Sequence, residues 1–400
     1  MRVVLLLAAG AAWETQALSV LGGRRDLVVL KRCVDVDDLL ATATSGQADS
    51  AVVAVEAPGF DVAAVDHLRR HGVRPVAVVA DEPGAVRAER IGVRRTVTDV
   101  AELPVALTTD AEPEPPPEAE PEAEARAGRG TVTAVWGPVG APGRTTVATA
   151  MAAALGRTER TTLIDVDPYG GTVAQVLGVL DEVSGLLAAA RLAGSGRLVE
   201  GFASVQRALD GRLTVVTGLP RPDRWSEVRP GTIELLAETA RTEGHVVLDA
   251  GPGLDEDDLT GRPSRGAITR AALEVADEIV AVGTADPVGL SRLARALTDL
   301  RAQHPVTPVR VVVNRMRPTL GWSERDVAAM LADFTRAVAI HFLPEDRATV
   351  DRALVTGRTV QETAPASPLA QAVDALVGRD GSSGRLRRLR PRTAGTTRPR

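Results

Sequence analysis

The sequence predicts an α/β protein in which a small α/β domain precedes a larger domain built on a doubly wound, mainly parallel sheet. Three observations support this fold class. Short apolar runs alternate with stretches of helical periodicity along two long segments, which is typical of βα units in parallel sheets. A stretch rich in Pro and Glu, with almost nothing to bury, separates the segments. A composition of 44% hydrophobic and 25% charged residues over 400 positions is enough for two or three domains.

The first segment, residues 1–108, is predicted to form the smaller parallel sheet. Apolar runs mark its expected strands at 3–8, 27–30, 51–55 and 75–79, and helical patterns mark its expected helices at 15–21, 35–42 and 62–71. Residues 109–129 follow as a linker. Because the stretch 110–124 holds seven acids and five prolines, we expect the linker to be stiff, extended and self-repelling.

The second segment, residues 130–379, repeats the βα alternation at greater length. Its seven expected strands lie at 132–136, 162–165, 213–217, 246–249, 278–282, 309–313 and 337–342. The helical stretches between them predict a doubly wound sheet with helices on both faces. Residues 380–400 are rich in Gly, Ser, Pro and Arg, so we expect a disordered tail.

Composition excludes several classes of protein. Cys33 is the single cysteine, which rules out an internal disulfide and a multi-cysteine metal site and agrees with a reducing compartment. The net charge of −5 argues against a protein that coats nucleic acid. The apolar run near Met1 is too short to span a bilayer, and no later run reaches the roughly 18 apolar residues of a spanning helix. We therefore expect a cytoplasmic protein.

The loop at 137–146 follows the first strand of the larger domain and opens a helix, which is the context of a phosphate-binding loop. Gly140 and Gly143 permit close approach of the backbone, and the amides from Gly143 to Thr146 are expected to face phosphate oxygens. Thr145 offers a hydroxyl to Mg²⁺. The usual phosphate-binding lysine is replaced by Arg144. Any cationic contact from this motif must therefore come from Arg144.

Polar side chains also end three later strands of the predicted sheet. Asp165 and Asp167 close one strand, Asp249 closes another before a Gly-rich turn, and Asn314 at a third is suited to the edge of an adenine. Each residue alone has an ordinary interpretation as a helix cap, a turn or a strand-end hydrogen bond. Their order on successive strand ends, where open α/β sheets bind ligands, predicts a nucleotide site.

Together these segments resemble the deviant-Walker P-loop ATPases of the MinD and ParA family, within the SIMIBI class. The matching segments, in family order, are 143–146, 165–171, 249–253, 312–315, 343–346 and 352–362. The resemblance implies that the domain binds ATP with Mg²⁺ held around Thr145 and Asp249. It also implies that Asp165 positions the attacking water and that Asn314 and Pro344 contact the adenine.

Two lysines of the family's loop are absent here. Val139 replaces the lysine that reaches across an ATP-bound homodimer, and Arg144 replaces the lysine that binds phosphate. Arg144 keeps the charge, although a planar guanidinium is not interchangeable with an ammonium at a tight phosphate site. Three functions stay open: an ATP-binding protein with or without hydrolysis, a pseudo-ATPase scaffold, and a ParA-like DNA-partitioning ATPase. The acidic net charge disfavours the DNA-binding alternative.

The smaller domain resembles a response-regulator receiver, as in the CpaE and TadZ branch of the family, where a receiver-like domain precedes a MinD-like one. Receivers need an acidic pair after the first strand and an acceptor Asp after the third. This chain has Ala8-Ala9-Gly10 and Glu56 at those places. The domain is therefore predicted to serve docking or localisation without accepting a phosphoryl group.

The resemblance implies a protein partner, and a role in organising that partner or a cell location such as a division site, a pole or a pilus base. The tail carries seven arginines and no acid between 381 and 400. The ordinary interpretation of such a segment is a solvated tail. The functional interpretation is reversible peripheral binding to an anionic membrane surface, with nonspecific contact with DNA or folding back onto the acidic linker as alternatives.

Overall fold

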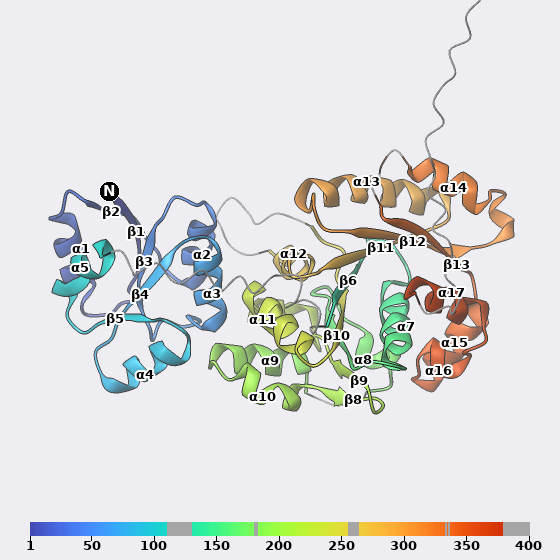
Figure 1. Ribbon diagram of the computed structural model, residues 1–400, viewed down its shortest axis with the longest axis horizontal. Helices are drawn as coiled ribbons and strands as arrows, with labels where there is room; N and C mark the ends of the chain where they lie inside the picture. The colour runs from blue at the N-terminus through green and yellow to red at the C-terminus, as the bar shows by residue number, and fades with distance from the viewer. Residues whose placement is uncertain (110–129, 180–182, 255–263, 333, 335–336, 379–400) are drawn as a thin grey trace, which may run out of the picture.

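The described residues form two separate sheets, one of five strands and one of eight (Figure 1). The computed structural model describes residues 1–109, 130–179, 183–254, 264–332, 334 and 337–378. The predicted linker, apart from Thr109, and the predicted tail at 380–400 lie outside the described residues. Within the described part of the chain, no helix is both long and apolar enough to cross a membrane.

The smaller domain contains a five-stranded parallel sheet with the order β2-β1-β3-β4-β5. This is the strand order of flavodoxin-like folds. Its elements are β1 (Arg2–Leu7), α1 (Glu14–Gly22), β2 (Leu27–Arg32), α2 (Val36–Thr44), β3 (Ser50–Ala54), α3 (Val62–Arg70), β4 (Arg74–Val78), α4 (Glu82–Arg90), β5 (Arg95–Val97), η1 (Val100–Glu102) and α5 (Leu103–Thr108).

The four expected strands and three expected helices of this domain are present, and the elements after β4 are additional. Pro83 and Gly84 in the first turn of α4 are poor helix formers, and β5 has three residues of which two are polar. A cap stabilises the start of α4, because the carboxylate of Asp81 accepts a hydrogen bond of 2.8 Å from the amide of Gly84. A side-chain cap of this kind leaves no mark in the pattern of hydrophobic residues from which helices are predicted.

The larger domain contains an eight-stranded sheet with the order β13-β12-β11-β6-β10-β7-β9-β8. Its elements are β6 (Val132–Trp136), α7 (Arg144–Gly156), β7 (Thr161–Val166), α8 (Val173–Val176), α9 (Gly185–Gly194), α10 (Leu198–Val205), β8 (Arg207–Ala208), β9 (Leu213–Val216), η2 (Pro222–Glu227), α11 (Pro230–Arg241), β10 (His245–Ala250), α12 (Gly266–Glu274), β11 (Glu278–Thr284), α13 (Pro287–Gln303), β12 (Val309–Met316), η3 (Pro318–Leu320), α14 (Glu324–Leu331), β13 (Ala339–Pro344), α15 (Arg347–Thr356), α16 (Val360–Thr363) and α17 (Pro368–Leu376).

All seven expected strands of the larger domain are confirmed as parallel neighbours in this sheet. The eighth strand, β8, has two residues and pairs antiparallel with β9, so it is too short to leave a pattern in the sequence. Strand residues alternate between two cores, as a period of two requires. Leu163 and Val247 face the core under α7 and α17, whereas Ile164 and Leu248 face the core under α9 to α13.

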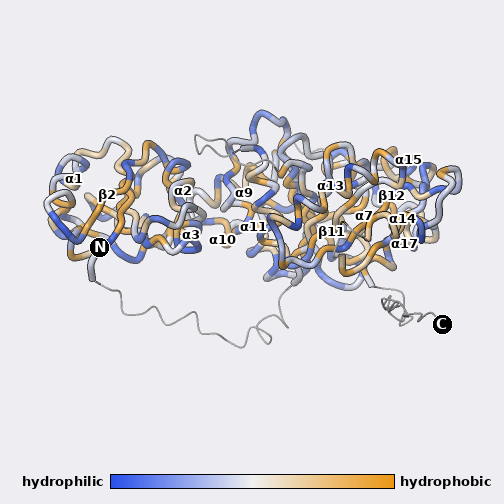
Figure 2. Tube along the Cα trace, turned by 90° about the horizontal axis from the view of Figure 1, so that it is seen from above, coloured by the Kyte–Doolittle hydropathy of each residue, from blue (hydrophilic) through white to orange (hydrophobic). Residues whose placement is uncertain are grey.

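The central strands are hydrophobic because helices cover both faces of the larger sheet (Figure 1). Every residue of β6 and β7 is buried. Figure 2 shows the same distribution along the backbone: β11 and β12 are mainly hydrophobic inside the larger domain, and the hydrophilic segments lie toward its outside. The sheet is therefore a rigid support for the residues that follow the carboxyl ends of its strands.

The two domains meet where α3 packs beside α11 (Figure 1). Arg70 of α3 forms an ion pair with Glu234 of α11. Arg229, which precedes α11, donates a hydrogen bond to the carbonyl of Gly59 and lies 3.9 Å from a carboxylate oxygen of Asp37. The guanidinium of Arg229 therefore contacts both the loop before α3 and the first turn of α2 in the smaller domain.

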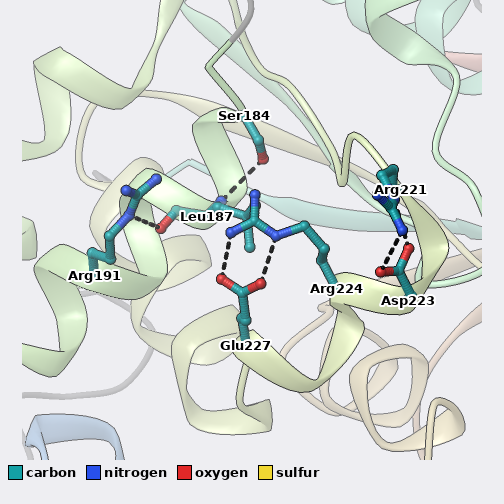
Figure 3. Close-up of polar contacts among 7 residues, drawn as sticks. All are labelled: Ser184, Leu187, Arg191, Arg221, Asp223, Arg224 and Glu227. Atoms are coloured by element: carbon teal, nitrogen blue, oxygen red, sulfur yellow. Dashed lines mark hydrogen bonds and ion pairs between the residues drawn. The ribbon is translucent and has the colours of Figure 1, made fainter.

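We predict that Arg229→Ala loosens this contact between the domains. A hydrogen bond from a charged donor contributes about 1.5–3 kcal/mol, so amides of α3 that are protected only by docking should exchange about tenfold faster or more. Hydrogen–deuterium exchange of the full chain measures this. Arg224→Ala is the matched control, because among the described residues the guanidinium of Arg224 pairs with nearby Glu227 in η2 alone (Figure 3). Equal exchange of α3 in the two variants would show that Arg229 does not hold the domains together.

Candidate functional site

The carboxyl ends of several strands meet at one edge of the larger sheet. β10 lies between β6 and β7, and its register places Asp249 beside Val135 on one side and Asp165 on the other. β12 is separated from β6 only by β11 and brings Asn314 toward the same edge. The fold therefore brings together the residues that the sequence places on successive strand ends.

The loop that leaves β6 ends in a helix start without a side-chain cap. Gly140 and Gly143 have φ angles of 76° and 96°, in the left-handed region that favours glycine. Gly143 is the N-cap residue of α7 and has no side chain to satisfy the first amides of the helix. Among the described residues, nothing accepts a hydrogen bond from the amides of Arg144, Thr145 and Thr146. Free amides at the positive end of a helix suit an anion such as phosphate.

The two predicted Mg²⁺ ligands are in direct contact. The Thr145 hydroxyl donates a hydrogen bond of 2.7 Å to the carboxylate of Asp249. Asp249 is 2% exposed. Burial raises the pKa of Asp249 to about 7, and the hydrogen bond from Thr145 and the charge of Arg144 oppose that shift. A cation beside this carboxylate would favour its ionised form.

Asp165 is enclosed beside Asp249 at the end of β7. Its carboxylate accepts hydrogen bonds from the backbone amides of Asp167, at 3.2 Å, and Val173, at 3.1 Å. Burial, and secondarily the charge of Asp249, raises the pKa of Asp165 well above its ordinary value. A Cβ atom added to Gly171 or Gly218 would collide with this carboxylate. Its predicted role in positioning water stays a prediction.

Arg144 folds back onto the loop and does not extend into solvent. Its guanidinium donates hydrogen bonds to the carbonyls of Gly137, at 3.2 Å, and Pro138, at 3.3 Å. It also lies 3.5 Å from a carboxylate oxygen of Asp167, and the other oxygen of Asp167 accepts the amide of Tyr169 at 2.8 Å. Arg144 and Asp167, both predicted to bind the nucleotide, therefore lie together, but here they contact each other.

A pocket of about 450 Å³ opens beside the loop. It is lined by four of the predicted residues, Gly143, Thr146, Asn314 and Pro344, together with residues of α15 and α17. The Asn314 side chain donates a hydrogen bond of 3.1 Å to the carbonyl of Pro142, and its oxygen accepts the amide of Arg315 at 2.9 Å. Asn314 therefore anchors the loop as well as forming a wall of the pocket.

Two arginines at this edge are absent from the sequence prediction. Arg315 lines the pocket with a left-handed φ of 59°, at a bulge where the pairing of β12 with β13 shifts. Arg292 of α13 lies against Gly140, because a Cβ atom added there would collide with its guanidinium. No local motif marks Arg292, and Arg315 ends the matching segment 312–315 without a role assigned to it. In an arginine-rich chain the residue type alone carries little information.

The described residues contain no group of three or more His, Cys, Asp or Glu side chains placed to hold a metal ion. Thr145 and Asp249 are thus a partial set of ligands. Mg²⁺ is commonly bound by one or two protein oxygens, with phosphate and water supplying the others. The residues present fit a Mg²⁺ ion that arrives with a nucleotide and not a resident ion.

Gly143→Ala should damage both the loop and the pocket. An added Cβ would collide with the side-chain amide of Asn314, and alanine is strained at a φ of 96°. Gly321→Ala is the matched control, because Gly321 has a φ of 76° and open space around it. We expect Gly143→Ala to lower the free energy of unfolding by about 1–3 kcal/mol more than Gly321→Ala in denaturant titrations. Similar losses of unfolding free energy in the two variants would contradict the close approach of Asn314 to Gly143.

Asp249→Asn should change how stability depends on pH. Because the folded state raises the pKa of Asp249 to about 7, the native carboxylate costs stability as pH rises from the ordinary Asp pKa to about 7. Asparagine still accepts the Thr145 hydroxyl but does not ionise. Across this interval we expect the free energy of unfolding of the variant to rise relative to that of the natural chain, by at most about 4 kcal/mol. Below about pH 4 we expect no such gain.

Unfolding by denaturant at several pH values measures this difference. Asp223→Asn is the control, since Asp223 is exposed and its hydrogen bond with Arg221 lowers its pKa (Figure 3). A constant stability difference between Asp249→Asn and the natural chain over the whole range would contradict the raised pKa of Asp249.

Comparison with known proteins agrees with this geometry. The sequence profile described as "CobQ/CobB/MinD/ParA nucleotide binding domain" (CbiA) matches residues 133–359. The ParA family ATPase of Chlorobium tepidum TLS is 16% identical, with a TM-score of 0.51 over 62% of this chain and 97% of that one. The cell division ATPase MinD of Pyrococcus furiosus is 19% identical, with a TM-score of 0.50 over 62% of this chain and 98% of that one. At these identities the structures show likeness of fold alone. No curated protein matches the chain.

Proposed function

Because the chain belongs to the CobQ/CobB/MinD/ParA nucleotide-binding family, we propose that its larger domain binds ATP together with Mg²⁺. One observation carries this proposal: the Thr145 hydroxyl meets Asp249 at 2.7 Å directly beside the free amides at the start of α7. Phosphate oxygens suit those amides, and Mg²⁺ suits the two oxygen ligands. When bound, the metal neutralises phosphate charge.

The pocket beside Gly143 supports the same assignment for the nucleoside. Its position next to the first turn of α7 lets one ligand contact the loop amides and the pocket together. We propose that Asn314 and Pro344 contact the adenine there. Of the two donor hydrogens on the Asn314 amide, one is bound to Pro142. The other hydrogen is available for a ring nitrogen of the base.

Hydrolysis is a separate proposal from binding. Asp165 is the residue we propose for positioning the attacking water, and Arg144 for stabilising the charge on the phosphates. Arg144 now donates to Gly137 and Pro138 and lies near Asp167. It must give up part of this set to reach a phosphate. These contacts favour a second candidate, a pseudo-ATPase scaffold in which Arg144 only braces the loop.

We propose that ATP binding organises a protein partner or a cell location, as in a MinD-like or CpaE-like protein, and that the chain acts as a homodimer. One of the two similar structures is that of a cell division ATPase, which supports a role in organising a cell location. The smaller domain is proposed as a receiver-like docking module. Its flavodoxin-like strand order supports this, and Glu56 is exposed after β3 with Ala8 to Gly10 after β1. Membrane contact through the arginine-rich tail belongs to the same proposal.

Calorimetric titration of the full chain with ATP and Mg²⁺ tests the proposed function. We expect measurable binding that requires Mg²⁺, because the metal links Asp249 to the phosphates. Thr145→Ser keeps the hydroxyl and should bind, whereas Thr145→Ala should weaken binding about tenfold or more. No heat and no thermal shift at millimolar nucleotide would reject ATP binding and leave the scaffold. Equal binding by both variants would reject the assigned role of Thr145.

A further inference from the structure

The phosphate loop has a second guanidinium beside it that no sequence motif reveals. A Cβ atom added to Gly140 would meet Nη1 and Cζ of Arg292, so this side chain covers the outer turn of the loop. Arg292 comes from α13, which begins after β11, the strand next to β6. The loop and this helix therefore leave neighbouring strands at the same edge of the sheet.

Close packing fixes α13 in this position. A Cβ atom at Gly283 would collide with Leu293, and one at Gly289 would collide with Thr284, so the helix lies directly on β11. The carboxylate of Asp286 accepts the amide of Gly289 at 3.0 Å and caps the helix. Leu293 is fully buried, next to Arg292 in sequence. The backbone that carries Arg292 is thus held against the loop by the core.

The two guanidinium groups at the loop differ in their partners. Arg144 is bound by two carbonyls and lies near Asp167. Arg292 is exposed, and no acceptor or acid among the described residues pairs with it. A guanidinium presents a planar fork of donors that matches phosphate oxygens. Of these two guanidinium groups, Arg292 and not Arg144 is without a partner among the described residues.

We propose that Arg292 binds the terminal phosphate of a nucleoside triphosphate in the same chain, and so replaces a cation that the loop itself lacks. This inference rests on the proposed ATP binding. It predicts that Arg292 contributes to the affinity for phosphates beyond the first and not to the affinity for the nucleoside. The side chain needs only to rotate inward from Gly140, because its backbone is already fixed.

Titration of the full chain and its Arg292→Ala variant with ATP, ADP and AMP, each with Mg²⁺, tests this. We expect Arg292→Ala to weaken ATP binding about tenfold or more, as for the loss of a charge-assisted hydrogen bond, and to leave AMP binding unchanged. Arg292→Lys should recover part of the loss. Arg301→Ala, near the other end of α13, is the matched control and should bind ATP like the natural chain.

Unchanged thermal unfolding without nucleotide confirms that Arg292→Ala is folded, as expected for an exposed side chain. If the natural chain binds ATP and Arg292→Ala binds it equally well, the inference is wrong and the proposed function stands. If Arg292→Ala weakens the binding of ATP and AMP equally, Arg292 only maintains the conformation of the loop, and the inference is also wrong. No ATP binding by the natural chain would overturn both.

Discussion

Two carboxylates buried side by side at the ends of β7 and β10 are the constraint on which the rest of this site depends. Asp165 and Asp249 are register neighbours, and like charges in a buried environment oppose each other. The fold stabilises them differently. Asp165 is held by two backbone amides, whereas Asp249 is held by the Thr145 hydroxyl. Because Thr145 lies in the first turn of α7, the hydrogen bond that satisfies Asp249 also fixes the helix start against the sheet.

The sequence reveals which strand ends form the site better than it reveals the contacts of their side chains. Apolar runs locate the strands, and parallel strands deliver their carboxyl ends to one edge, so Asp165, Asp249 and Asn314 could be grouped from pattern alone. The partners of each side chain could not, because they depend on loop geometry. Asn314 binds Pro142 instead of pointing freely into the pocket. Short or polar elements such as β5 and β8 were missed for a related reason: their stability comes from neighbours and not from their own residues.

The contact between the domains is continuous with the strand that carries Asp249. α11 provides Glu234 to the contact with α3, and the chain passes from α11 directly into β10. A movement of α11 along its axis would act on β10 at its first residue, His245, at the opposite end of the strand from Asp249. β10 is paired on both sides, by β6 and β7, and therefore resists such movement. The larger domain thus positions the smaller one through α11, which is followed by the rigid strand β10.

Arg144, a guanidinium where the family has an ammonium, explains the hydrogen bonds that hold the loop. A lysine donates all of its hydrogen bonds from one nitrogen, whereas a guanidinium donates from three nitrogens spread over a planar fork. Arg144 reaches the carbonyls of Gly137 and Pro138 and approaches Asp167 at once, so it links the end of β6 to the end of β7. This arrangement stabilises the loop without a ligand, and a phosphate must compete with these contacts for Arg144. The substitution therefore converts a residue type that would be free for phosphate into a structural brace. The proposed phosphate binding then relies more on the free amides of α7 and, through Mg²⁺, on Asp249.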